Sequence, residues 1–474
     1  MEKKKSPFCT LRFWRRAAVL FLVAYALLAT VPYLPHKEVS EDFQAEYAAR
    51  NFYGEGPGAE RVAYIDNSED ALLCRLNLIQ SAEKELILST FDFNADESGT
   101  DVLAALYQAA ERGVQVRVLI DGTSGLLDVR GNENFRALEH HENAQIRIYN
   151  PIDLLRPWTM QARLHDKYLI ADGARYLLGG RNTTDLFLGN YAPEKLNIDR
   201  ELLVVGGDTA PDTSLRQLEQ YFEAVWALPA SRPLPDRAPR DEDALRDTLA
   251  QRYAALQAQW PQAFTDWDWE ACTFETGAVN LLSNPIGPEN KEPWMWYALS
   301  DLMSGAEDVV IYTPYIICGP EMYADLERIT GGGAGVEILT NAVASGANPW
   351  GCTDYLNQKK RIRRTGVQVY EYMGTQSSHT KTLVLDDRLS VVGSYNLDMR
   401  STYQDTELML VVDSPELNRR IREEAERDKT YSRTMEADGT YVQGEHYNDQ
   451  ELGPVKQALY AVLRVAILPL RRFL

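Results

Sequence analysis

Cysteine and histidine are both scarce in this 474-residue chain, which has five cysteines and six histidines. No two cysteines stand in CxxC spacing, so the usual signatures of a zinc ribbon or a thioredoxin-like redox site are missing. The odd number also argues against a complete intrachain disulfide framework. We expect most of the cysteines to be small buried apolar residues.

An excess of positive charge is also missing. The chain has 49 Lys and Arg against 69 Asp and Glu, a formal net charge of -20. Proteins that bind nucleic acid nonspecifically show a basic footprint, so no nucleic-acid partner is expected. The first 16 residues are the exception, with six basic side chains against the single acid Glu2. A basic segment beside an apolar run is a signal of membrane topology.

The apolar run that follows, Ala17–Leu34, contains no charged residue. As a helix, 18 residues extend about 27 Å, close to the hydrocarbon thickness of a bilayer. The flanks predict a cytoplasmic tail over 1–16, a single transmembrane helix over 17–34 and an extracytoplasmic body. A retained anchor is our main interpretation, and a cleaved signal peptide is the alternative.

An internal repeat organises the remaining chain. Strand-like stretches at 85–93, 114–122 and 144–150 enclose helical patterns, and stretches at 308–317, 335–341 and 366–372 repeat that order. Alternating strands and helices predict an α/β sheet in each copy, and a repeat of this length predicts duplicated domains. We expect a linker over 35–60, a first domain over 61–230, a linker with a helix over 231–271, a second domain over 272–435 and a tail over 436–474.

Each copy ends in a block with the same internal spacing. The first block contains His165, Lys167, Asp172, Gly179-Gly180 and Asn182, and the second contains His379, Lys381, Asp386, Gly393-Ser394 and Asn396. We expect each histidine and lysine to lie in a strand, where residues two apart share a face.

If the two copies face each other, one pocket holds two imidazoles, two ammonium groups and two amides. Lysines and amides can neutralise the nonbridging oxygens of a phosphoryl group. One histidine can attack phosphorus while the other protonates the leaving oxygen. The block therefore predicts phosphoryl or phosphatidyl transfer, with the two imidazoles titrating as a coupled pair.

Four acidic residues complete the candidate catalytic set. Glu201 and Glu407 stand at equivalent strand starts and could orient the imidazoles, with exposed strand-end acids as the alternative. Asp172 and Asp386 lie within the blocks at expected strand ends, where aspartate commonly makes turns, so a structural role is favoured for both.

These blocks resemble the signature of the phospholipase D superfamily, HxKx4Dx6G[SG]xN, present twice per chain. The similarity extends from about residue 60 to 435, and the first motif, Gly-Gly-Arg-Asn, is similar to that of C-type bacterial cardiolipin synthases. The resemblance implies two α/β/α domains related by a pseudo-twofold axis, with one active site between them.

The resemblance also implies a phosphohistidine intermediate, no cofactor and no metal. His165 is the expected nucleophile, although the two histidines could exchange roles. The implied reaction transfers a phosphatidyl group to phosphatidylglycerol and forms cardiolipin at a bacterial cell membrane. The expected partners are therefore phospholipid and membrane.

Other functions stay open at this stage. A phosphodiesterase of the same superfamily could hydrolyse phospholipid, or nucleic acid despite the acidic charge, and a lipid-binding scaffold could lack activity. Residues 455–474 could lie at the membrane interface or dock onto their own domain. The basic cluster at 358–366 could meet anionic headgroups or form a solvated helix face.

Overall fold

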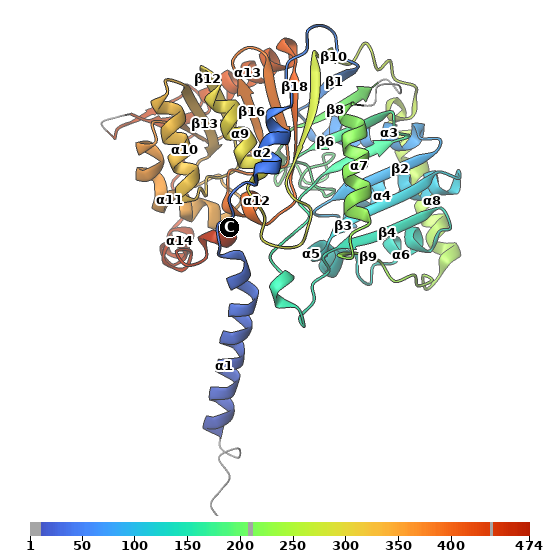
Figure 1. Cartoon of the computed structure of the whole chain (residues 1–474). Coiled ribbons are helices and arrows are strands. Elements are labelled where there is room, and N and C mark those ends of the chain that lie inside the picture. Colours follow the sequence, from blue (N-terminus) through green and yellow to red (C-terminus); the bar gives the residue numbers. More distant parts are fainter. Residues whose placement is uncertain (1–10, 207–211, 437–438) are drawn as a thin grey trace, which may run out of the picture.

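The computed structural model describes residues 11–206, 212–436 and 439–474. Within these ranges the chain forms two α/β halves that lie side by side, with one long helix extending away from them (Figure 1). Residues 1–10 of the expected cytoplasmic tail, including Cys9, lie outside the described residues.

The first half is built on a mixed sheet of nine strands among the described residues. Three neighbouring strands toward one edge of the sheet pair parallel, and the other pairings are antiparallel. The order across the sheet is β10 (Phe274–Glu275), β1 (Glu60–Ile65), β8 (Glu201–Gly206), β6 (Arg175–Gly179), β5 (Tyr168–Ala171), β2 (Glu85–Thr90), β3 (Gln115–Asp121), β4 (Ala144–Tyr149) and β9 (Ser231–Pro233).

The second half repeats this topology. Its order is β11 (Ala278–Ser283), β18 (Leu408–Asp413), β17 (Leu389–Gly393), β16 (Thr382–Leu385), β12 (Asp308–Tyr312), β13 (Gly335–Asn341), β14 (Gln368–Tyr372), β19 (Ser432–Met435) and β20 (Tyr441–Gln443). The parallel strands are again the three that the sequence repeat predicts, β12, β13 and β14. The expected duplication of an α/β domain is confirmed.

Helices cover both faces of each sheet because strand side chains alternate between the faces. In β2, Leu86 and Leu88 pack in an outer core with α3 (Ser68–Ser81), α4 (Glu97–Glu111), α6 (Glu133–His140) and α8 (Glu242–Gln259), whereas Ile87 joins the core between the two halves. That central core contains α7 (Ser214–Trp226) and α13 (Pro415–Thr430). The second sheet has its own outer core with α9 (Trp294–Ser304), α10 (Pro320–Gly331) and α11 (Pro349–Arg364).

The structure differs from the expected division of the chain at three places. Strand β9 lies just beyond residue 230 and pairs with β4, and β10 lies beyond residue 272 yet pairs with β1 of the first half. The expected linker over 35–60 contains α2 (Glu41–Ala48), whose Phe43 ring stacks on Trp294 at 4.5 Å. These short segments were missed because their place depends on neighbours that are distant in sequence.

The long helix α1 (Leu11–Thr30) continues into the short helix η2 (Val31–Tyr33). Together they form a 22-residue apolar stretch, Arg12–Tyr33, with mean hydropathy 1.7, long enough to cross a membrane. Its apolar side chains face outward, for example Leu20 with 69% and Phe21 with 66% of their surface exposed. A helix packed in a protein core would bury such residues, so α1 has the properties of an anchor or a signal sequence.

Candidate active site

His165 lies three residues before the start of β5 and is hydrogen-bonded to the other half of the molecule. Its amide donates to Thr406 Oγ1 at 3.1 Å, and the Thr406 amide donates to the Arg163 carbonyl at 2.9 Å. His165 Nδ1 lies 2.9 Å from Oε1 of Glu407, which precedes β18 in the second half. This contact fixes the ring and leaves Nε2 as the nitrogen that can react.

His379 is held in the reciprocal way. The short strands β7 (Asn197–Ile198) and β15 (Ser377–Ser378) pair across the two halves, and the His379 amide donates to the Ile198 carbonyl at 2.6 Å. His379 Nδ1 lies 2.6 Å from Oδ2 of Asp199. Each imidazole is therefore oriented by a carboxylate from the opposite half.

The two blocks differ from the expectation in where their strands begin. Strands β5 and β16 start at Tyr168 and Thr382, after each lysine, so neither histidine lies within a strand. The histidine segments hydrogen-bond across the interface instead of extending their own sheets. Propensity favours a strand there, but only the opposite half supplies the backbone partners.

Glu201 does not contact a histidine, although it occupies the position equivalent to Glu407. Its carboxylate accepts two hydrogen bonds from the buried Arg75, at 2.6 and 2.7 Å, and lies 3.7 Å from Arg181 Nε. The histidine partner in the first half is Asp199, two residues earlier.

The physical reason for this exchange is visible at Gly180. A Cβ at position 180 would lie 2.6 Å from Asp199 Oδ2, so only glycine leaves room for that carboxylate. The equivalent residue Ser394 instead donates its hydroxyl hydrogen bond to Oε2 of Glu407. The glycine in Gly-Gly-Arg-Asn was thus a sequence signal for the displaced acid.

The lysines and asparagines of both blocks are buried. Lys167 is 3% exposed and Lys381 is 1% exposed, and each ammonium donates to the carbonyl of the histidine two residues before it. Among the described residues, the side-chain oxygens of Asn182 and Asn396 have no hydrogen-bond partner. Unpaired buried side-chain oxygens at equivalent positions fit contacts to a polar ligand.

Asp172 and Asp386 lie at the turns that follow β5 and β16 and contact neither histidine. Both adopt positive φ, 55° and 48°. The Asp172 carboxylate accepts hydrogen bonds from the amides of residues 83–85, and the Asp386 carboxylate accepts from the amides of 307 and 308. These contacts fasten the turn to the start of a neighbouring strand, which is the structural role that their position favours.

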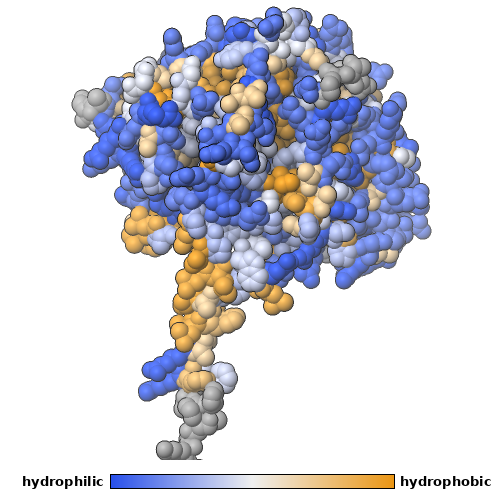
Figure 2. Space-filling model, viewed as in Figure 1, coloured by the Kyte–Doolittle hydropathy of each residue, from blue (hydrophilic) through white to orange (hydrophobic). Residues whose placement is uncertain are grey.

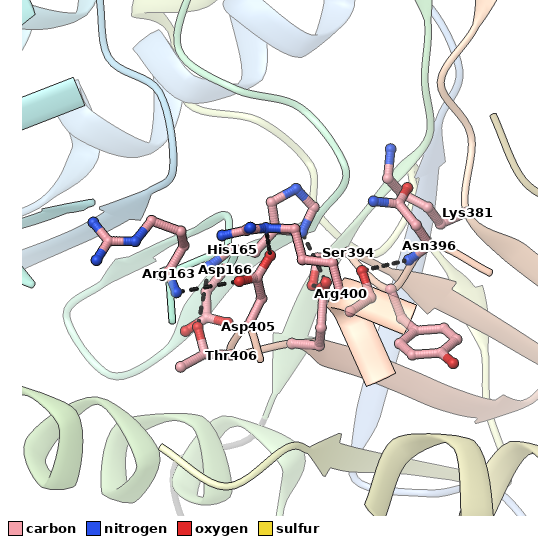
Figure 3. Close-up of polar contacts among 12 residues, drawn as sticks. Arg163, His165, Asp166, Lys381, Ser394, Asn396, Arg400, Asp405 and Thr406 are labelled. Atoms are coloured by element: carbon pink, nitrogen blue, oxygen red, sulfur yellow. Dashed lines mark hydrogen bonds and ion pairs between the residues drawn. The ribbon is translucent and has the colours of Figure 1, made fainter. Parts of the chain in front are cut away.

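Arg400 was not found from the sequence. It lies in α12 (Met399–Tyr403), where its Nε is 2.9 Å from Asp405 Oδ2 and its Nη2 donates to the Gln161 carbonyl at 2.5 Å. Figure 3 shows its guanidinium beside the His165 ring. The equivalent position in the first block is Leu186, so the repeat gave no signal for this cation.

The two histidine partners differ in their electrostatics. Burial raises the pKa of Glu407 to about 8, against the opposing charge of Lys167 and the hydrogen bond from Ser394. Burial also acts to raise the pKa of Asp199, but Lys381 and His379 outweigh it and hold that pKa at about 2. Asp199 is therefore the more firmly ionised of the two acids.

Burial, with the charges of Lys167 and Lys381, lowers the pKa of His165 well below its usual value. Burial and Lys381 lower the pKa of His379 to about 4. Burial also lowers the pKa of Lys167 to about 7 and that of Lys381 to about 8. A bound phosphodiester anion would raise the pKa of all four groups, because a nearby negative charge stabilises their protonated forms.

The duplicated halves and their shared histidine pair define an enzyme that transfers phosphoryl groups at one composite site. Residues 76–226 and 299–429, together more than half of the chain, match the family described as "Cardiolipin synthase, PLD-like domain". The chain therefore belongs to the phospholipase D superfamily, in the cardiolipin synthase-like family, and is a phosphatidyltransferase of that family.

Named relatives agree with this family. Cardiolipin synthase C of Escherichia coli K12 is 28% identical over 401 residues, covering 76% of this chain and 83% of the relative. Cardiolipin synthase 1 of Bacillus cereus is 26% identical over 388 residues, covering 80% and 69%. The crystal structure of phosphatidylserine synthase from Haemophilus influenzae Rd KW20 has a TM-score of 0.62 at 18% identity, covering 92% of this chain and all of that one, and so shares the fold.

Proposed function

We propose that this enzyme transfers a phosphatidyl group from one phosphatidylglycerol to the free glycerol hydroxyl of another, forming cardiolipin and releasing glycerol. The observation that carries the proposal is the reciprocal pairing of His165 with Glu407 and of His379 with Asp199. The named cardiolipin synthases among its relatives support the choice of substrate.

In the first step, Nε2 of His165 attacks phosphorus, and the bond from phosphorus to the glycerol oxygen breaks. Glycerol leaves with a proton from His379, and the phosphatidyl group stays on His165. We assign the acid to His379 because the firmly ionised Asp199 stabilises an imidazolium better than the raised-pKa Glu407 does. Lys167 and Lys381 balance the charge on the nonbridging oxygens.

In the second step, His379 takes the proton from a hydroxyl of the second phosphatidylglycerol. That oxygen attacks phosphorus, the bond from phosphorus to His165 breaks, and cardiolipin is released. The covalent intermediate divides one substitution into two in-line steps. Neither step requires a metal or a cofactor.

We further propose that α1 anchors the enzyme in a bacterial membrane with the catalytic body outside. The apolar length of α1 and the basic residues before it support this arrangement. Protease added to intact protoplasts should digest the body. Full protection of the body would reverse the topology.

The function is tested with full-length enzyme in vesicles of phosphatidylglycerol, with products identified by mass spectrometry. Cardiolipin and glycerol should form in equal amounts, with and without a chelator. The double variant His165→Ala/His379→Ala is the inactive control. Phosphatidic acid without cardiolipin would show a phospholipase instead, because water would then resolve the intermediate, and loss of activity in chelator would contradict the metal-free steps.

A further inference from the structure

Large apolar side chains are exposed on the side of the body from which α1 leaves. We call this surface the basal face, made of the turn residues Leu126 and Leu127, the loop residues Leu154, Leu155 and Trp158, and the α14 residues Val455, Leu459, Val462 and Val465. In Figure 2, orange surface gathers on α1 and near it at the base of the body, while most of the remaining visible surface is blue. Soluble surfaces rarely collect so many apolar side chains on one side.

The loop between β4 and β5 extends toward α1. Leu154 is 67% exposed and Leu155 is 87% exposed, although the loop is held in place. Tyr25 Oη of α1 donates to the Leu154 carbonyl at 3.0 Å. Tyr25 lies five residues before Thr30, the last residue of α1, which is about 7.5 Å along a helix, so the loop extends past the body end of α1.

The helix α14 (Pro454–Ala466) shows an apolar stripe facing outward. Val455, Leu459, Val462 and Val465 recur every three or four residues and are 50–85% exposed. The opposite side packs on the body, where Tyr460 is buried and Arg464 Nε lies 2.8 Å from Asn357 Oδ1. Docking onto its own domain is thus observed for one face of α14, and the other face stays free for contact with a membrane interface.

The residues that follow α14 contact η2, the short helix that continues α1. Arg472 Nε donates to the Tyr33 carbonyl at 3.0 Å, and its guanidinium lies 3.6 Å from the centre of the Tyr403 ring. The β4–β5 loop therefore contacts α1 and the end of the chain contacts η2, which continues α1, so the basal face has a fixed position relative to the helix.

Cationic side chains border the apolar ones. A groove of about 340 Å³ between the π-helical turn η3 (Gly125–Val129) and β9 is lined by Leu126, Ile152 and Leu234, with Arg130, Arg232 and Arg237 also in its wall. Within the described residues, none of these three arginines forms an ion pair. Apolar side chains next to free cations complement an anionic lipid surface in both respects.

We infer that the basal face lies against the bilayer in which α1 is embedded, with the β4–β5 loop and the outer stripe of α14 inserted into the adjacent leaflet. The inference rests on the proposed anchoring by α1. A bilayer is the occupant that fits, because α1 carries the basal face directly to its surface and the loop extends past the body end of the helix. The enzyme would then hold its body in one orientation on the membrane that supplies its substrate.

The test measures the depth of single nitroxide labels on full-length enzyme in vesicles that contain phosphatidylglycerol. Labels are placed by Leu155→Cys and Val462→Cys in a background with Cys9→Ser and Cys272→Ser, since Cys74, Cys318 and Cys352 are buried. Asp387→Cys, at the exposed turn between β16 and β17, is the matched control, because this turn belongs to none of the segments that make the basal face.

Relaxation by oxygen, which concentrates in lipid, should exceed relaxation by a water-soluble nickel chelate at 155 and 462, and the reverse should hold at 387. Equal behaviour at all three positions would overturn the inference. So would spin–spin broadening at 462 without increased oxygen exposure, because a second copy would then cover the stripe.

A second variant keeps the test independent of the label. Leu154→Ser/Leu155→Ser should reduce turnover of phosphatidylglycerol in vesicles several-fold and leave turnover of a short-chain analogue in detergent unchanged, with Leu154→Met/Leu155→Met as the apolar control. Unchanged turnover in vesicles would count against an inserted loop. If the labels report lipid contact but no cardiolipin forms, the proposed function fails while the inference stands.

Discussion

Each half orients the histidine of the other half through a carboxylate, but the two carboxylates stand at different positions of the repeat. His165 is oriented by Glu407, and Ser394 holds the other oxygen of that carboxylate. His379 is oriented by Asp199, which reaches it because Gly180 has no side chain. The comparison shows that the duplication kept the relation between imidazole and carboxylate while the acid moved by two residues in one copy.

The move left Glu201 available for a different task. In the first half it forms a buried ion pair with Arg75, whereas the equivalent Glu407 contacts His165. The site is thus symmetric in its histidines, lysines and asparagines and asymmetric in its acids. We expect this asymmetry to separate the roles of nucleophile and general acid.

The largest expected effect comes from removing either imidazole. His165→Ala and His379→Ala should each lower turnover by about 10³-fold or more, since catalytic groups that act together lose most of their effect when one is removed. With a phosphatidyl substrate that has a nitrophenol leaving group, His379→Ala should still release nitrophenolate, which needs no acid, and His165→Ala should not. The opposite pattern would exchange the two roles.

The next effect separates Asp199 from Glu201. Asp199→Asn should lower kcat by about 10²–10⁴-fold, because an amide cannot stabilise the imidazolium of His379. Glu201→Gln should mainly lower the free energy of unfolding, by about 3–5 kcal/mol, because it leaves Arg75 buried without its partner. Denaturant titrations and steady-state kinetics on both variants check the difference. A catalytic defect in folded Glu201→Gln equal to that of Asp199→Asn would refute the assignment.

A smaller effect is expected when the halves are made alike. Gly180→Ser should lower kcat by about 10–100-fold, because the new side chain displaces the Asp199 carboxylate from His379. Ser394→Gly is the inverse control, which removes one hydrogen bond to Glu407 without any steric conflict and should cost less. The chemical shifts of the His379 ring should change in Gly180→Ser only. Wild-type kinetics in Gly180→Ser would show that the glycine is not required.

The smallest effect on chemistry is expected at the turns. Asp172→Ala and Asp386→Ala should lower the free energy of unfolding by about 1–3 kcal/mol, since backbone amides lose their acceptor. Activity per folded molecule should stay close to that of the wild type, because neither residue contacts a histidine. A kcat reduced a hundredfold without loss of stability would return them to the catalytic set.

Local pattern was enough to predict the duplicated α/β domains, and it identified the two blocks from their identical spacing. Strands such as β3 and β13 follow from short segments rich in β-branched and apolar residues, which need no distant partner to be recognised. In contrast, α2 was assigned to a linker and β10 to the wrong half, because α2 packs on Trp294 and β10 pairs with β1, and both partners are distant in sequence. The same limit applied to Arg400, whose place beside His165 has no counterpart in the repeat.

The sequence by itself determined which groups we propose for the chemistry, because two histidines, two lysines and two asparagines recur at one spacing. Only the tertiary structure decided which acid serves which histidine and which exposed leucines lie beside α1. The physical reason is that both depend on contacts between segments far apart in the chain, where a missing side chain at Gly180 or a hydrogen bond from Tyr25 sets the geometry.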